Sequence, residues 1–165
     1  MNRILVVGGV AGGASVAARI RRLDEAAEIT VFERGPHVSF SNCALPYYLS
    51  GYISKSEKLV LMTPEKFKKQ YNIEVRTGSE VIEINRQAKC VTVKKAADGS
   101  TYTQNYDILV LSPGASPIVP RSIVGTDKPH VFTVRNVVDI VKLKDYIDEN
   151  AVEHISVVGG GFIGL

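Results

Sequence analysis

The chain has 165 residues, of which 45% are hydrophobic and 22% charged, proportions typical of a globular protein with one core. Its net charge of +3 is small and its basic residues fall in short groups, which argues against a nucleic-acid-binding protein. Glycines interrupt the apolar start of the chain, and no stretch approaches the roughly 20 apolar residues of a membrane helix. We therefore expect a soluble, cytoplasmic protein.

The first 33 residues have the pattern of a strand, a helix and a second strand. Apolar runs at residues 4–7 and 29–33 predict buried strands, and residues 13–23 predict a helix between them. Two parallel strands joined by a helix form a right-handed crossover unit. The apolar face of the helix is predicted to consist of Val16, Ile20 and Leu23.

The middle of the chain predicts a small antiparallel sheet after a short helix. Residues 64–70 are helical in character, and alternating runs at residues 80–85 and 89–95 predict strands that lead to a turn at Asp98 and Gly99. A small meander is therefore inserted before the chain returns to the parallel sheet. A strand at 107–111 buried on both faces, a helix at 136–150 and a strand at 154–158 complete the predicted elements.

A glycine-rich turn between the first strand and the first helix resembles a dinucleotide fingerprint. Gly8, Val10 and Gly13 occupy its three positions, and Glu33 follows 20 residues after Gly13 at a strand end, where it can accept ribose hydroxyls. Val10 departs from the usual middle glycine. The alternative is a glycine-rich turn with an exposed glutamate. The residues predicted to hold the nucleotide in this turn are Gly8, Val10, Ala11, Gly12 and Gly13.

A second fingerprint, Gly159, Gly161 and Gly164, follows the strand predicted at 154–158. Two dinucleotides are the usual arrangement when a nicotinamide reduces a flavin, whereas the alternative is a glycine-rich tail outside any fold. We therefore expect an α/β fold in which residues 1–150 form part of a Rossmann-like FAD-binding domain. Residues 151–165 would begin an NAD(P)H-binding domain, and a chain ending there would have no turnover by itself.

The sequence contains two cysteines, and Cys43 is the candidate for chemistry. Asn42 is predicted to cap a helix that ends at Gly51, which places Cys43 at the positive end of that helix and favours the nucleophilic thiolate. The alternative is a buried, inert thiol. Cys90 alternates along a strand with polar residues, and we interpret it as structural.

Polar residues recur along the first helix at the spacing of one helix face. Ser15, Arg19 and Arg22 form this stripe, which is called the arginine stripe below. Two guanidinium groups on one face can bind phosphates, although a solvated face is the commoner meaning of such a pattern.

Five segments resemble a known family over essentially the whole chain: VVGGVAGGASVAARIRRLD, VSFSNCALPYYLSG, TPEKF, YDILVLSPGASPIVP and VVGGGFIGL. They are similar to coenzyme A-disulfide reductases and to NADH-dependent persulfide reductases, which are pyridine nucleotide-disulfide oxidoreductases. The segment with the single cysteine is the specific part.

This resemblance implies that NADH or NADPH reduces FAD, which passes two electrons to sulfur at Cys43, in a homodimer that needs no metal. The substrate is then a disulfide or persulfide, with coenzyme A as substrate or bound ligand. The coenzyme A site implied by the resemblance comprises Ser15, Arg19, Arg22, Ser39 and Asn42. The implied FAD contacts comprise Glu33, Arg34, Asn42, Val81, Ser112 and Gly114.

Two other functions fit the same residues. In an NADH oxidase or peroxidase, Cys43 would cycle through a sulfenic acid instead of a mixed disulfide. A non-catalytic nucleotide-binding module is the second alternative, because a fold alone does not establish an activity.

Overall fold

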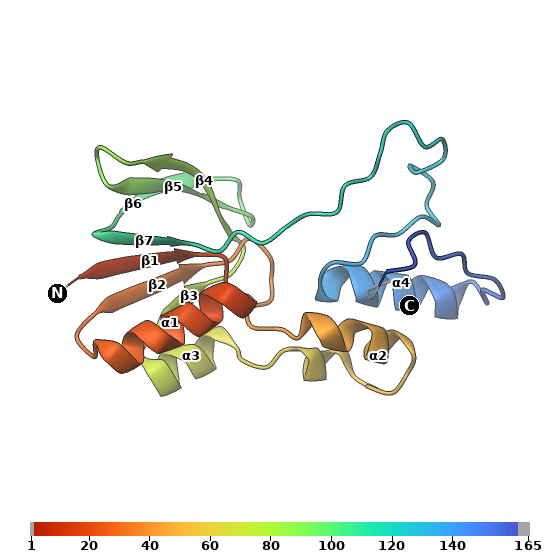
Figure 1. Ribbon diagram of the computed structural model, residues 1–165, viewed down its shortest axis with the longest axis horizontal. Coiled ribbons are helices and arrows are strands. Elements are labelled where there is room, and N and C mark those ends of the chain that lie inside the picture. Colours follow the sequence, from red (N-terminus) through yellow and green to blue (C-terminus); the bar gives the residue numbers. More distant parts are fainter. Residues whose placement is uncertain (1, 162–165) are drawn as a thin grey trace.

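The computed structural model describes residues 2–161, which form a layered α/β core and a smaller helical lobe (Figure 1). A parallel sheet with strand order β3-β2-β1-β7 is the middle layer of the core. Its strands are β1 (Arg3–Val7), β2 (Glu28–Phe32), β3 (Glu74–Arg76) and β7 (Ile108–Leu111). The predicted α/β fold is confirmed.

Helices α1 (Ala11–Leu23) and α3 (Pro64–Tyr71) cover one face of the sheet (Figure 1). Small residues of α1, including Ala14 and Ala17, are buried against the sheet and let the helix approach it closely. The predicted apolar face of this helix is wrong at its end, because Leu23 is 70% exposed.

The antiparallel meander lies on the opposite face of the sheet (Figure 1). Leu5 and Phe32 of the parallel sheet pack there against Val91 and Val93, which are fully buried. The predicted meander is thereby confirmed. Its strands are β4 (Ser79–Asn85), β5 (Cys90–Lys95) and β6 (Thr101–Asn105).

Within the described residues, β7 is an edge strand of the sheet. Contacts between Asp107 and Arg3 hold the start of β7 to β1. The backbone N–H of Arg3 donates to the Asp107 carboxylate at 2.7 Å, and together with the Arg3 guanidinium it lowers the pKa of Asp107. A strand buried on both faces was predicted at 107–111, and within the described residues β7 is only partly buried. Ile108 and Leu111 are 47% and 57% exposed, because the layers packed on the two faces of the sheet cover only Leu109 and Val110 of this strand in part.

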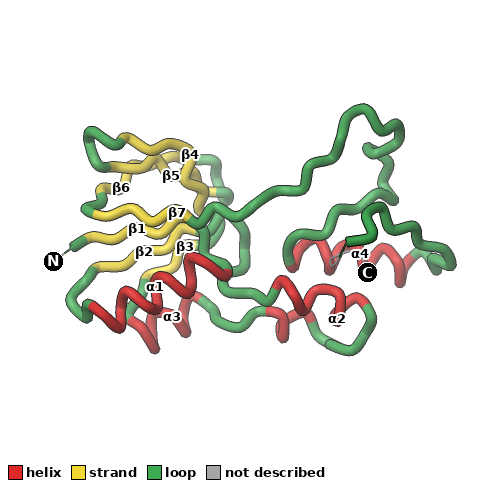
Figure 2. Tube along the Cα trace, in the orientation of Figure 1, coloured by secondary structure: helices red, strands yellow, loops and turns green. Residues whose placement is uncertain are grey.

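The helical lobe packs α2 (Leu45–Leu49) against α4 (Val137–Glu149). Two 3₁₀ turns flank α2, Asn42–Ala44 and Ser56–Leu59. The loop from β7 to α4 runs from the sheet to this lobe (Figure 2). The helix predicted at 136–150 is confirmed, and it begins with a capping box in which the Asn136 side chain accepts from the backbone of Asp139.

The strand predicted at 154–158 is wrong. Residues 152–161 contain no strand, and Val157 and Val158 are 64% and 95% exposed. A strand needs a neighbour to pair its backbone N–H and C=O groups. Among the described residues, no strand lies beside this segment.

Candidate functional site

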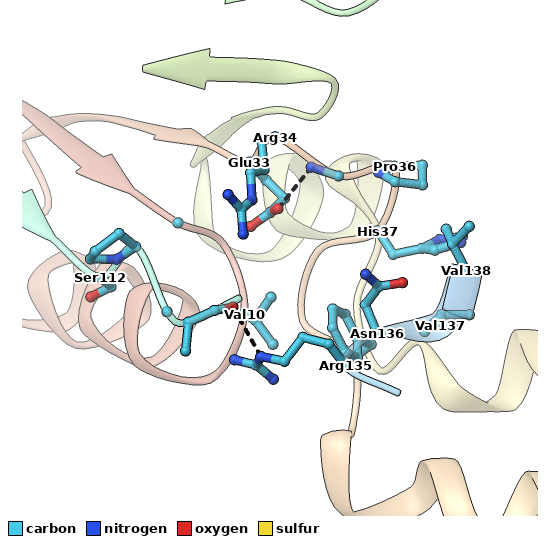
Figure 3. A pocket seen from close by; sticks show the side chains of 16 residues that line it. Val10, Glu33, Arg34, Pro36, His37, Ser112, Arg135, Asn136, Val137 and Val138 are labelled. Carbon is cyan, nitrogen blue, oxygen red and sulfur yellow. Dashed lines mark hydrogen bonds between the residues drawn. The ribbon is translucent and has the colours of Figure 1, made fainter. Parts of the chain in front are cut away.

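A small cleft with a volume of about 130 Å³ lies at the carboxyl ends of β1, β2 and β7 (Figure 3). β1 lies between β2, the next strand in the chain, and β7, which returns much later. Ligands of open α/β sheets bind at such a reversal of strand order. The residues predicted from sequence that line this cleft are Gly8, Val10, Glu33, Arg34, Ser112 and Gly114.

The turn from β1 into α1 accepts only glycine at two of its positions. Gly8 has a φ of +94°, and a Cβ there would overlap the carbonyl oxygen of Ser112 in the loop after β7. A Cβ on Gly13 would overlap the carbonyl oxygen of Gly8. These two glycines therefore allow the loop after β7 and the helix to approach the same turn closely.

The N-terminus of α1 opens beside this cleft without a cap of its own. Val10 occupies the N-cap position with no side-chain hydrogen bond, and the first turn contains no acidic residue. Ala11 and Gly12 are exposed, whereas Gly13 is buried. The first N–H groups of a helix have no partner within it, and they carry partial positive charge. The arrangement is suited to bind an anion such as a pyrophosphate.

Glu33 is held directly after β2 by two backbone amides. The N–H of Gly9 donates to Oε2 and the N–H of Gly35 donates to Oε1, each at 2.8 Å. Each oxygen retains capacity to accept a further hydrogen bond. This placement at a strand end is compatible with the predicted contact to ribose hydroxyls.

The loop after β7 forms another wall of the cleft. The backbone N–H of Ser112 donates to the carbonyl of Val7 at 2.8 Å, so the loop begins beside the glycine turn. Arg34 donates to the hydroxyl of Ser116 at 3.0 Å and connects the loop to the end of β2. Gly114 has a φ of +69°, which favours glycine at that bend.

The start of α4 closes the cleft from the side of the helical lobe (Figure 3). Sequence reasoning predicted this helix but not its place at the site. The capping pattern of Asn136 and Asp139 marks where a helix begins, but it gives no information on which strands the helix faces. The lining residues that were not predicted include Pro36, His37, Phe40, Arg135, Asn136, Val137 and Val138.

Cys43 is a free, exposed thiol in the 3₁₀ turn that leads into α2. The thiol is therefore not buried, contrary to the alternative, and its reactivity stays a prediction. The predicted helix cap is also wrong: Asn42 is the first residue of the turn, and Ser41 holds the cap position without a side-chain bond. The Asn42 side chain instead accepts a hydrogen bond from Arg135 at 3.3 Å. Cys90 is a half-buried thiol on β5, as its strand pattern predicted.

The arginine stripe is exposed along α1. Its three side chains make no hydrogen bond or ion pair to other parts of the chain between residues 2 and 161. Ser39 lies beside the glycine turn, because its N–H donates to the carbonyl of Gly9 at 2.9 Å. The role of these residues stays a prediction.

Three further predicted residues lie away from the cleft. Val81 packs in the meander cluster, and Gly159 and Gly161 are exposed outside the sheet. Gly164 lies outside the described residues. Within the described part of the chain there is no group of three or more metal-ligating side chains, and no helix is long and apolar enough to cross a membrane.

The cleft lies where the strand order reverses, a glycine turn borders it, and a carboxylate follows the adjacent strand. Together these features define a nucleotide-binding α/β protein of the Rossmann class. Residues 2–165 match the pyridine nucleotide-disulphide oxidoreductase family, and the chain belongs to that family. The resemblance found in the sequence is confirmed.

Known relatives narrow the likeness within this family. Coenzyme A disulfide reductase of Staphylococcus epidermidis is 42% identical over all 165 residues, which span 37% of that protein. A crystal structure of reduced Bacillus anthracis CoADR-RHD matches with a TM-score of 0.95 and 52% identity, covering 99% of this chain and 29% of that one. An NAD-dependent persulfide reductase from A. fulgidus matches with a TM-score of 0.84 and 36% identity, covering 89% and 28%.

Proposed function

We propose that this chain supplies the flavin cleft and the redox thiol of an FAD-dependent NAD(P)H:disulfide oxidoreductase. Residues 1–150 would be the N-terminal part of the FAD-binding domain, and residues 151–165 would begin the NAD(P)H-binding domain. The observation that carries the proposal is an exposed Cys43 whose neighbour Asn42 bonds Arg135, a residue that lines the cleft.

Three features of the cleft fit FAD. The uncapped start of α1 offers N–H donors to a pyrophosphate. At Gly8 and Gly13 a Cβ would overlap carbonyl groups of the chain itself, so only glycine gives this turn its shape beside the cleft. Glu33 presents carboxylate oxygens to ribose hydroxyls. When bound, FAD supplies two-electron transfer between a nicotinamide and sulfur.

The thiolate of Cys43 would attack one sulfur of a disulfide substrate. A bond forms between that sulfur and Cys43, the substrate S–S bond breaks, and the other half takes a proton and leaves as a thiol. Two electrons and a proton then release the second half and restore the thiolate. The exposed position of Cys43 gives an external substrate access to it.

The proposed substrate class is coenzyme A disulfide, or a related persulfide or polysulfide. The supporting observation is the arginine stripe, whose two guanidinium groups are exposed with no partner between residues 2 and 161. Guanidinium groups bind phosphates in a fork geometry, and coenzyme A carries phosphates at its nucleotide end. The full-length protein is proposed to be a cytoplasmic homodimer, and its thiols fit a reducing compartment.

The test compares Cys43→Ser with Cys90→Ser in the full-length protein. Cys43→Ser should abolish NAD(P)H-driven reduction of coenzyme A disulfide while the flavin absorbance remains, whereas Cys90→Ser should retain nearly full turnover. Retained disulfide reduction in Cys43→Ser would contradict the proposal. Turnover by the wild type with oxygen or peroxide alone would assign the protein to the oxidase branch instead.

A further inference from the structure

We infer that Arg135 is a positioning residue, which fixes the turn that carries Cys43 against the nucleotide cleft. Arg135 directly precedes the N-cap of α4 and lines the cleft (Figure 3). The expected effect of Arg135 on catalysis rests on the proposed function, whereas the contacts by which it holds the turn do not.

The Arg135 side chain connects two segments that are far apart in the sequence. Its Nε donates to the carbonyl of Ala115 in the loop after β7 at 3.1 Å, the bond drawn beside Val10 in Figure 3. Its Nη1 donates to Oδ1 of Asn42 at 3.3 Å. One guanidinium therefore joins the sheet side of the cleft to the residue that precedes Cys43.

The backbone of Arg135 is held in place independently of these two side-chain bonds. Its backbone N–H donates to the carboxylate of Asp139 at 3.0 Å, and the same carboxylate accepts from the backbone of Asn136. Substitution of the Arg135 side chain leaves this N–H in place, so the start of α4 keeps its capping box. The role of the side chain can thus be tested separately from the stability of the helix.

The turn that carries Cys43 depends on tertiary contacts for its orientation. It has three residues, is followed by a five-residue helix, and has no side-chain cap at its start. Helices this short are not stable by themselves. The buried side chain of Leu45 holds the segment from the helical lobe, and Arg135 holds Asn42 from the cleft.

The experiment measures amide hydrogen exchange in the full-length protein with the substitutions Arg135→Met, Asn42→Ala and both together. Arg135→Met keeps an unbranched side chain but removes every donor. We expect exchange in a peptide covering residues 42–49 to become about tenfold faster, with no change in peptides from β1 or β2. The double variant should exchange no faster than the more affected single variant, because both changes remove the same bond.

Two further variants control the measurement. Arg121→Met removes an exposed arginine from the same loop and should leave the 42–49 peptide unchanged. Arg135→Lys retains one donor group and should give an intermediate exchange rate. Unchanged exchange at 42–49 in Arg135→Met, or additive effects of the two single substitutions, would overturn the inference whether or not the protein reduces disulfides.

Kinetics then separate positioning from binding. If the wild type reduces coenzyme A disulfide, Arg135→Met should lower kcat about tenfold, with the KM for the disulfide within twofold of the wild-type value and the flavin retained. A raised KM with unchanged kcat would make Arg135 a substrate ligand, and loss of flavin with unchanged exchange would make it a cofactor ligand. Either result would overturn the inference. A wild type without disulfide turnover would refute the proposed function. The exchange data would still show whether Arg135 holds the turn that carries Cys43 in place.

Discussion

The carboxylate of Glu33 accepts the backbone N–H of Gly9 at 2.8 Å, so the end of β2 fixes the turn that follows β1. Its second oxygen accepts the N–H of Gly35 at the same distance. The acidic residue at the end of β2 therefore holds the glycine turn in place as well as facing the cleft. A sequence fingerprint assigns it only the second role.

Glu33→Gln should weaken both the turn and the binding of FAD. Two backbone donors face this side chain, but glutamine offers one oxygen acceptor, so an N–H would be left opposite the amide nitrogen. We expect the free energy of unfolding to fall by about 1–2 kcal/mol and the FAD dissociation constant to rise about tenfold. Urea unfolding and flavin titration of the full-length protein measure these changes. Glu80→Gln, an exposed glutamate on β4, is the matched control, and equal effects of the two substitutions would refute the role of Glu33.

Gly13→Ala and Gly12→Ala should have opposite effects on stability. Alanine is the better helix former by about 1 kcal/mol, and a Cβ on Gly12 would meet only the movable Ser112 side chain at 3.3 Å. A Cβ on Gly13 would overlap the fixed carbonyl of Gly8, so α1 must shift. We expect Gly13→Ala to lower the free energy of unfolding by about 3 kcal/mol and to reduce bound flavin. Similar stability of the two variants in urea would show that the close contact is not required.

The sequence predicted the elements whose signals are local and missed features that depend on distant partners. The α4 helix was predicted from its capping residues, but its place beside the glycine turn follows from packing of Val137 and Ile140 on the α2 region. The same limit explains Asn42, which was expected to cap a helix. Its side chain bonds Arg135, which lies 93 residues away and which no local pattern connects to it.

The strand predicted at 154–158 failed for the same reason. Its apolar run satisfies the local pattern, but a strand exists only where a neighbour pairs with it.

The buried face of α1 shows a different limit of prediction from sequence. Helical spacing predicted that large apolar residues would be buried, whereas close packing on the sheet selected the small Ala14 and Ala17.

Arg21→Ala should destabilise the core without changing the cleft. The Arg21 guanidinium donates to five carbonyls at 2.6–3.2 Å, where the end of α1, the approach to β2 and the end of α3 meet. Losing this connection should lower the free energy of unfolding by about 2–3 kcal/mol in urea. Arg22→Ala is the matched control, because that side chain is exposed on the same helix and should change stability by less than about 0.5 kcal/mol. A small effect at both positions would show that solvent replaces the Arg21 bonds.

The double variant Arg19→Ala/Arg22→Ala tests whether the arginine stripe binds the nucleotide end of coenzyme A. Both guanidinium groups are exposed on α1 with no partner between residues 2 and 161, so their removal should leave the folded chain intact. We expect the KM for coenzyme A disulfide to rise about tenfold or more, with kcat nearly unchanged, because the contacts would serve binding and not the reacting sulfur. The KM for a small polysulfide should stay within twofold of the wild-type value.

Arg86→Ala/Lys94→Ala removes the same charge from the meander, on the sheet face opposite α1, and is the control for a general loss of positive charge. The difference between the two double variants should shrink at high salt, since phosphate contacts at an exposed surface are screened. Equal changes in KM for both substrates, or equal effects of both double variants, would make the arginine stripe a solvated face.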